Sequence, residues 1–181
     1  MKIVILPIGD IEEKVLYTIQ EKLSSILPNV EATISREKMP LPQGAFNPSR
    51  QQYYSTMILS MVKNYADVYD LDRVLGVSDV DLYVPGLNFV FGEAQCPGKA
   101  ALISIFRLKP EFYGEPANEE LFYNRSAKEA LHEIGHALGL RHCENWRCVM
   151  FFSNSILDTD RKESSFCEKC YMKLVRFIGK A

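Results

Sequence analysis

Residues 132–142, HEIGHALGLRH, constrain the fold of this chain more than any other stretch. On a helix, His132 and His136 lie one turn apart on the same face and can bind one metal ion. Glu133, beside the first histidine, is placed to accept a proton from water that a zinc ion activates. The spacing therefore predicts a helix that carries a hydrolytic zinc site, with Glu133 as the general base.

Two further residues extend this motif. Gly139 can adopt the left-handed conformation that ends a helix, and this turns the chain so that His142 returns to the metal as a third ligand. The alternative is a chance match, because short HExxH patterns also arise on ordinary surface helices. The chain has only three histidines and all of them fall in the motif, which favours the three-histidine zinc site.

Composition indicates a soluble globular protein of one domain. Of 181 residues, 47% are hydrophobic and 24% are charged, and no apolar run approaches the roughly 20 residues that span a bilayer. The start, MKIVILPIGD, is cut by Pro7 and does not resemble a signal peptide. We expect a cytoplasmic monomer, and with a net charge of -2 we expect no nucleic-acid or membrane partner.

Four of the five cysteines cluster near the end of the chain. They form two pairs with zinc-site spacing, C-ENWR-C and C-EK-C, and comprise Cys143, Cys148, Cys167 and Cys170. Four thiolates in this pattern predict a closed structural zinc site. Buried free thiols and a redox pair are the alternatives. Cys96 stands apart, either as a small apolar residue or as an inhibitory ligand of a nearby metal.

The remaining pattern predicts a mixed sheet with packed helices. We expect helices over 11–27 and 49–65, from their apolar spacing, and the end of a further helical turn at 73–76. We expect strands over 3–8, 30–34, 79–84, 87–94 and 100–108, and we expect hairpins to join the last three of them. The motif helix begins at either Asn118 or Ser126, since both positions offer a capping residue.

The motif region resembles the archaemetzincin family. The likeness rests on HEIGHALGLRHCENWRCVM followed by CEKC, and on GVSDVDLYVPGLNFVFGEA, ISIFRL and FSNS; it covers most of residues 70–175. It implies an α/β (α+β) zincin-like fold, with a twisted mixed sheet and packed helices, and the active-site helix under a cleft. It also implies a small C-terminal subdomain with a structural zinc. We therefore expect one catalytic domain over 1–181, with an N-terminal subdomain over about 1–139 and a zinc-stapled subdomain over about 140–181.

By the same resemblance, several residues acquire roles. His132, His136 and His142 hold a catalytic zinc, and Met150 lies beneath the metal as the Met-turn residue. In zincins an edge strand beside the motif helix binds an extended substrate. The candidate residues for this strand, which are otherwise ordinary sheet residues, are Asn88, Phe89, Val90 and Phe91.

The sequence thus predicts a zinc metallopeptidase with two zinc ions, one catalytic and one structural, that acts on short or unfolded peptides. The alternative is a zinc-binding protein that keeps the zincin fold and acts by interaction, with little or no peptidase activity. The intact Glu133 favours the enzyme.

Overall fold

A computed structural model describes residues 1–179. Its centre is a five-stranded sheet with the strand order β2-β1-β5-β8-β7. The first four strands of this order are parallel, and only β7 runs antiparallel to its neighbour β8. The strands are β1 (Lys2–Ile8), β2 (Glu31–Ile34), β5 (Arg73–Ser78), β7 (Gly92–Ala94) and β8 (Ala100–Ser104).

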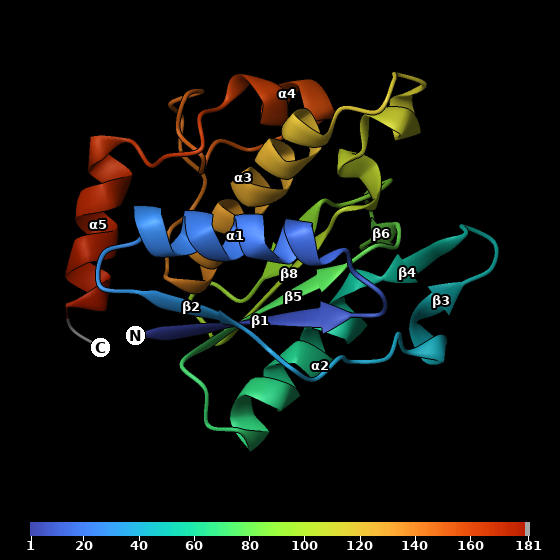
Figure 1. The fold of residues 1–181 in the computed structure, drawn as a ribbon, viewed down its shortest axis with the longest axis horizontal. Coiled ribbons are helices and arrows are strands. Elements are labelled where there is room, and N and C mark those ends of the chain that lie inside the picture. The colour runs from blue at the N-terminus through green and yellow to red at the C-terminus, as the bar shows by residue number, and fades with distance from the viewer. Residues whose placement is uncertain (180–181) are drawn as a thin grey trace.

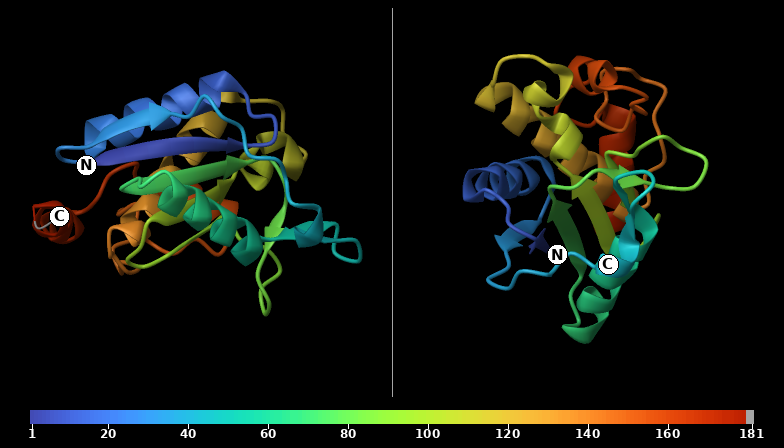
Figure 2. Two further views of the ribbon diagram at one scale, coloured as in Figure 1. Left: turned by 90° about the horizontal axis from the view of Figure 1, so that it is seen from below. Right: turned by 90° about the vertical axis from the view of Figure 1, so that its right-hand side faces the viewer.

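Helices cover both faces of the sheet. Helices α1 (Glu13–Ile26) and α3 (Glu119–Ala137) lie on one face, and α2 (Ser55–Val68) lies on the other (Figures 1 and 2). Two apolar cores follow from this arrangement, because successive strand residues point to opposite faces. Ile3 and Ile5 pack toward α1 and α3, whereas Leu6 and Ile8 pack toward α2. The predicted twisted mixed sheet with packed helices is confirmed.

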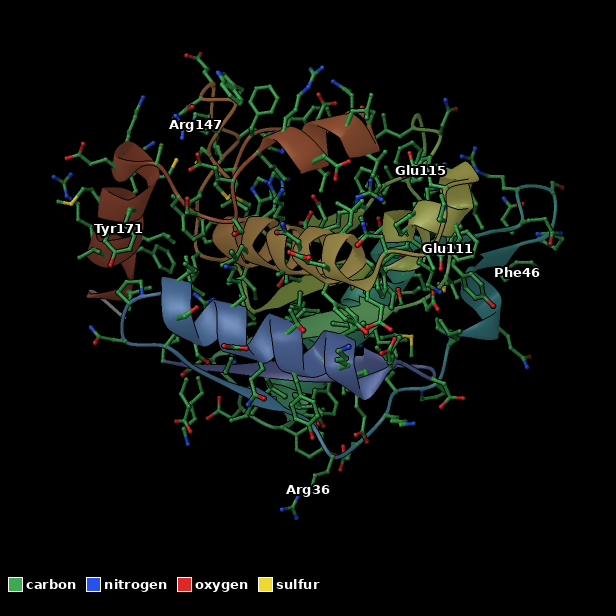
Figure 3. All side chains as sticks on the ribbon, turned by 45° about the horizontal axis from the view of Figure 1, so that its top comes forward. Arg36, Phe46, Glu111, Glu115, Arg147 and Tyr171 are labelled. Atoms are coloured by element: carbon green, nitrogen blue, oxygen red, sulfur yellow. The ribbon has the colours of Figure 1, made fainter. Side chains whose placement is uncertain are left out.

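Smaller elements complete the chain. A three-stranded sheet is formed by β3 (Phe46–Asn47), β4 (Gln52–Tyr54) and β6 (Leu82–Tyr83). Short 3-10 turns lie at Gln43–Ala45, Phe106–Leu108 and Pro110–Tyr113. Helix α4 (Ile156–Arg161) packs on α3, and α5 (Glu168–Ile178) ends the described chain (Figure 1). On α5, Cys170 and Leu174 are buried, whereas Tyr171 lies on the outer face (Figure 3).

The expected helical turn at 73–76 is wrong, because these residues begin β5, in the middle of the sheet. Val74, Leu75 and Val77 are fully buried, and a parallel central strand reads as a continuous apolar run. Gly76 suits the strand rather than a helix end. A Cβ there would come within 2.8 Å of both Ile8 and Val62 side chains, so the glycine lets α2 approach the sheet.

Other boundaries also differ from expectation. The helix expected over 49–65 begins only at Ser55, since residues 52–54 form β4, in which Tyr53 and Tyr54 pair with β6. The strands expected over 79–84 and 87–94 shorten to two and three residues. β7 and β8 are antiparallel and form the expected hairpin. β5 and β8 are parallel, so the chain between them crosses over rather than forming a hairpin. Within residues 1–179, no helix combines the length and apolar character needed to cross a membrane.

Candidate active site

Helix α3 carries the motif and is capped at its start. The Asn118 side chain accepts a hydrogen bond from the Leu121 backbone N–H at 3.0 Å. Of the two helix starts that the sequence allowed, the structure selects Asn118. Ser126 instead lies within the helix and donates its hydroxyl to the Phe122 carbonyl.

The three histidines converge on one point. Nε2 of His136 lies 3.1 Å from Nε2 of His132 and 3.2 Å from Nε2 of His142. Tetrahedral zinc with Zn–N distances of about 2.0–2.1 Å places two nitrogen ligands about 3.3 Å apart. The observed spacing therefore fits a zinc ion at this centre.

Backbone carbonyls fix the orientation of two of these rings. Nδ1 of His132 lies 2.7 Å from the Val149 carbonyl oxygen, and Nδ1 of His136 lies 2.7 Å from that of Leu140. Since a carbonyl only accepts, Nδ1 carries the proton in each ring and Nε2 presents its lone pair. Burial lowers the pKa of His132 well below its ordinary range and also lowers the pKa of His136 and of His142. These directions favour the neutral form of the three rings, which is the form that binds a metal.

Gly139 ends α3 and allows the chain to bring His142 close to the other two histidines. Its φ is +84°, a left-handed conformation, and its N–H bonds to the His136 carbonyl at 2.8 Å. The next N–H, of Leu140, bonds to the Gly135 carbonyl at 2.9 Å. These bonds end α3 and reverse the chain, so that His142 reaches the other two rings, as its spacing predicted.

Glu133 lies in the cleft between α3 and the sheet. It is 5% exposed, and burial followed by the nearby charge of Glu129 raises its pKa well above the ordinary range. Gly92 on β7 faces it, and any Cβ at that position would collide with the Glu133 side chain. A buried carboxylate beside the histidine centre is suited to hold and transfer a proton.

Met150 is fully buried. A Cβ on Gly135 would come 2.4 Å from its Sδ, so the glycine between the two motif histidines allows the methionine to pack against α3. Met150 therefore packs against the helix that carries the histidines, and its role as the Met-turn residue stays a prediction.

The four clustered cysteines form a second centre. The Sγ atoms of Cys143, Cys148, Cys167 and Cys170 all lie within 4.8 Å of one another, and none forms a disulfide. Sγ of Cys143 is 3.8 Å from Sγ of Cys167, which matches the spacing of about 3.8 Å expected for two thiolates on tetrahedral zinc with Zn–S of about 2.3 Å. Burial raises the pKa of Cys148 and of Cys170. Gathering these thiols in a half-buried cluster suits a metal ion that neutralises them.

A cleft of about 690 Å³ opens above the histidines. Its walls include residues 87–94 and, on the other side, Phe152, Ser153 and Asn154. Residues 88–91 line this cleft but do not form the expected strand. Only Val90 bridges to Leu82, and the edge strand is Gly92–Ala94, because pairing with β8 begins at Gly92.

Several residues around the site were missed by sequence reasoning. Arg50 donates to the carbonyls of Leu87 and Asn88, each at 2.9 Å, and so holds the cleft loop. Glu129 lines the cleft and pairs with buried Lys162. No local pattern marks such distant pairings. Gly92 does offer a signal, since a glycine in a strand suggests close approach by another group.

Cys96 belongs to neither cluster. It is exposed, lines the cleft and donates its thiol to the Leu140 carbonyl at 3.3 Å. That carbonyl also accepts from His136.

A three-histidine centre and a neighbouring buried carboxylate, on a helix packed against a mixed sheet, are the features of a zinc metallopeptidase. Residues 1–176 match the sequence profile of Peptidase family M54, and the chain belongs to this family. Its relatives include the archaemetzincin of Methanocaldococcus jannaschii, which is 48% identical over 174 residues, 96% of this chain and 93% of the relative.

Solved structures agree with this assignment. The archaemetzincin of Methanopyrus kandleri superposes with a TM-score of 0.87 at 37% identity, over 99% of this chain and 96% of that chain. The archaemetzincin of Archaeoglobus fulgidus, solved with malonate, gives a TM-score of 0.83 at 42% identity, over 96% of this chain and 99% of that chain. The resemblance drawn from the motif, the predicted fold class and the zinc metallopeptidase function are confirmed.

Proposed function

We propose that this peptidase uses His132, His136 and His142 to hold a catalytic zinc ion, with Glu133 as its general base. The observation that carries the proposal is the convergence of three Nε2 atoms at 3.1 and 3.2 Å, with two rings oriented by carbonyls. We assign a second, structural zinc to the four-cysteine centre, whose sulfur spacing suits that ion.

Zinc at the three nitrogens would supply a Lewis acid that lowers the pKa of a water molecule and polarises the substrate carbonyl. Glu133 accepts the proton of the attacking water and then donates it to the leaving amine. Burial raises the pKa of Glu133, which makes its carboxylate a stronger proton acceptor for the first step.

We place the substrate backbone along β7. Ser104 N–H bonds to the Phe91 carbonyl and Gln95 N–H to the Ala100 carbonyl. Since hydrogen-bonded pairs alternate in an antiparallel ladder, the backbone groups of Gly92 and Ala94 point to the free edge. An extended peptide can add to this edge as a further strand. This supports short or unfolded peptides as substrates and moves the recognition strand from residues 88–91 to Gly92–Ala94.

Glu133→Gln tests the catalytic assignment. Turnover of a mixed peptide library should fall by about 10² to 10⁴, the range for loss of a general base, while zinc content stays at the wild-type value. Equal turnover in wild type and variant would mean that the histidine site is not the catalyst. A wild type that binds zinc but cleaves no peptide would favour the alternative of a zinc-binding interaction protein.

We further infer a cytoplasmic monomer of the metzincin type, with the segment from about residue 140 as a zinc-stapled subdomain. Residues 180 and 181 of that segment lie outside the described residues. Four reduced cysteines suit a reducing compartment, and a net charge of -2 gives no general attraction to nucleic acid. Size-exclusion chromatography at several concentrations tests the monomer.

A further inference from the structure

Lys162 is a fully buried lysine beside the active site. It is 1% exposed and directly follows α4. Its Nζ lies 2.9 Å from Oε1 of Glu129, and no hydrogen bond of good geometry reaches Nζ from any residue in 1–179. An ammonium group in such surroundings is costly unless a charge compensates it. Glu129 provides that charge.

Glu129 connects this lysine to the cleft. It lies on α3 one turn before Glu133, is 2% exposed and lines the same cleft as the histidines. Thr159 Oγ1 also donates to Oε1 of Glu129, at 3.1 Å. Both contacts fall on one carboxylate oxygen and come from the α4 side. They hold the carboxylate toward α4.

The pair is not required to attach α4 to α3. Arg125 already binds Asp160 through two hydrogen bonds of 2.7 Å, and Lys128 Nζ donates to the carbonyls of Thr159 and Asp160 at 3.0 and 3.1 Å. A buried ion pair is often no more stabilising than an apolar pair of similar volume. The position of the Lys162 charge therefore calls for another explanation.

Two carboxylates lie on one face of α3, and binding by Lys162 can hold one of them in place. Glu129 and Glu133 are four residues apart, where like charges repel, and both line the cleft that contains the histidines. Carboxylate oxygen is a good zinc ligand. A freely moving Glu129 would compete with water and with the substrate carbonyl for the open position on the metal.

We propose that Lys162 is a positioning residue of the active site, which binds Glu129 and keeps this second carboxylate away from the catalytic metal and from Glu133. The inference rests on the proposed function, because it requires a metal at the three histidines. Lys162 itself does not contact substrate, since its Nζ is fully enclosed.

Lys162→Met tests the proposal, because it keeps the length of the side chain and removes the charge. Zinc affinity at the histidine site, measured by chelator competition with the cysteine site filled, should rise about tenfold as a repelling cation is lost and a carboxylate is released. The kcat for a cleaved library peptide should fall about tenfold with little change in KM, because the metal position is obstructed. A variant that is merely destabilised would not bind zinc more tightly, so tighter zinc binding together with a lower kcat distinguishes the proposed role from a loss of stability.

The double variant Lys162→Met/Glu129→Gln removes the competing carboxylate and should return both zinc affinity and kcat toward wild type. Lys128→Met is the matched control, since it removes another buried ammonium from the same helix contact. It should lower Tm without raising zinc affinity. If Lys162→Met does not fold, Lys162→Gln removes the charge but keeps one donor for Glu129, so it should show both changes at a smaller size than full release of Glu129 would give.

Two results would overturn the proposal. One is a Lys162→Met variant whose zinc affinity falls together with its Tm, as in the control, which would mean a structural role. The other is a double variant that folds and stays slow, which would mean that Lys162 does not act through Glu129. Failure of the proposed function looks different, because the wild type itself would then bind no zinc at the histidines or would cleave no peptide.

Discussion

Gly92 lies directly against the side chain of Glu133. A Cβ at position 92 would be 2.6 Å from Cγ and 2.8 Å from Cδ of Glu133, and also 2.6 Å from the Leu102 carbonyl oxygen. The carbonyl belongs to the β5–β8–β7 ladder and cannot shift without breaking strand pairing. The missing side chain of one strand residue therefore creates the space that the carboxylate occupies.

Gly92→Ala should displace the Glu133 carboxylate. We expect kcat to fall by about 10², since a misplacement of about 1 Å has that effect on a catalytic group, while zinc content is retained. Peptide turnover and metal analysis of the same sample provide the measurement. Gly44→Ala is the matched control, because its Cβ would meet only Met57 Sδ, at an ordinary 3.8 Å. Unchanged kcat in Gly92→Ala would mean that Glu133 is not restrained from this side.

The grouping of the histidines and of the cysteines was predictable because it depends on short spacings. His132 and His136 are one helical turn apart, and Gly139 reverses the chain just before His142. Local stereochemistry is enough to bring such residues together. The same reasoning identified the helices over 13–26 and 119–137 and the first strand.

Features that depend on distant partners were not predictable. β5 was misread because its burial on both faces comes from two layers of helices that a local pattern does not reveal. The edge strand was placed a few residues early, since its start is set by pairing with β8. Lys162 lies 33 positions from Glu129 in the sequence, and a lone lysine there suggests only a solvated surface.

Gly135 and Met150 provide a second steric test. Gly135→Ala places a Cβ 2.4 Å from Met150 Sδ and should force the methionine away from α3. We expect the free energy of unfolding to fall by about 1–3 kcal/mol, as for overpacking, and zinc affinity at the histidines to weaken. Denaturant unfolding and chelator competition measure the two effects. Adding Met150→Ala should restore zinc affinity at least in part, and a lack of recovery would argue against direct contact as the cause.

The stability of the protein without histidine-bound zinc should depend on pH. Burial holds the pKa of His132 well below the ordinary 6.5. The unfolded chain takes up this proton below about pH 6.5, whereas the folded chain does so only at lower pH. The contribution of His132 to the free energy of unfolding should therefore fall as pH drops below about 6.5, by up to about 1.4 kcal/mol per pH unit.

Glu133 has the opposite effect on how the free energy of unfolding depends on pH. Burial raises its pKa well above the ordinary 4.5, so the folded state keeps a proton that the unfolded state has lost, and this stabilisation grows as pH falls toward 4.5. Glu133→Gln removes this contribution and should make the loss of stability between about pH 6.5 and 5 steeper. Denaturant titrations at several pH values compare the slopes. Equal slopes in the two proteins would contradict the assigned shift of Glu133.

The two proposed metal centres should depend on each other, because His132 Nδ1 donates to the carbonyl of Val149, the residue after Cys148. The Cys143 N–H also bonds to the Met150 carbonyl at 2.9 Å, which closes the loop between the centres. Cys148→Ser should therefore lower zinc occupancy at the histidines as well as at the cysteines. Metal analysis after dialysis against a weak chelator measures both losses. Cys96→Ser, outside the cluster, should retain two zinc ions per chain, and full histidine-site occupancy in Cys148→Ser would show that the centres are independent.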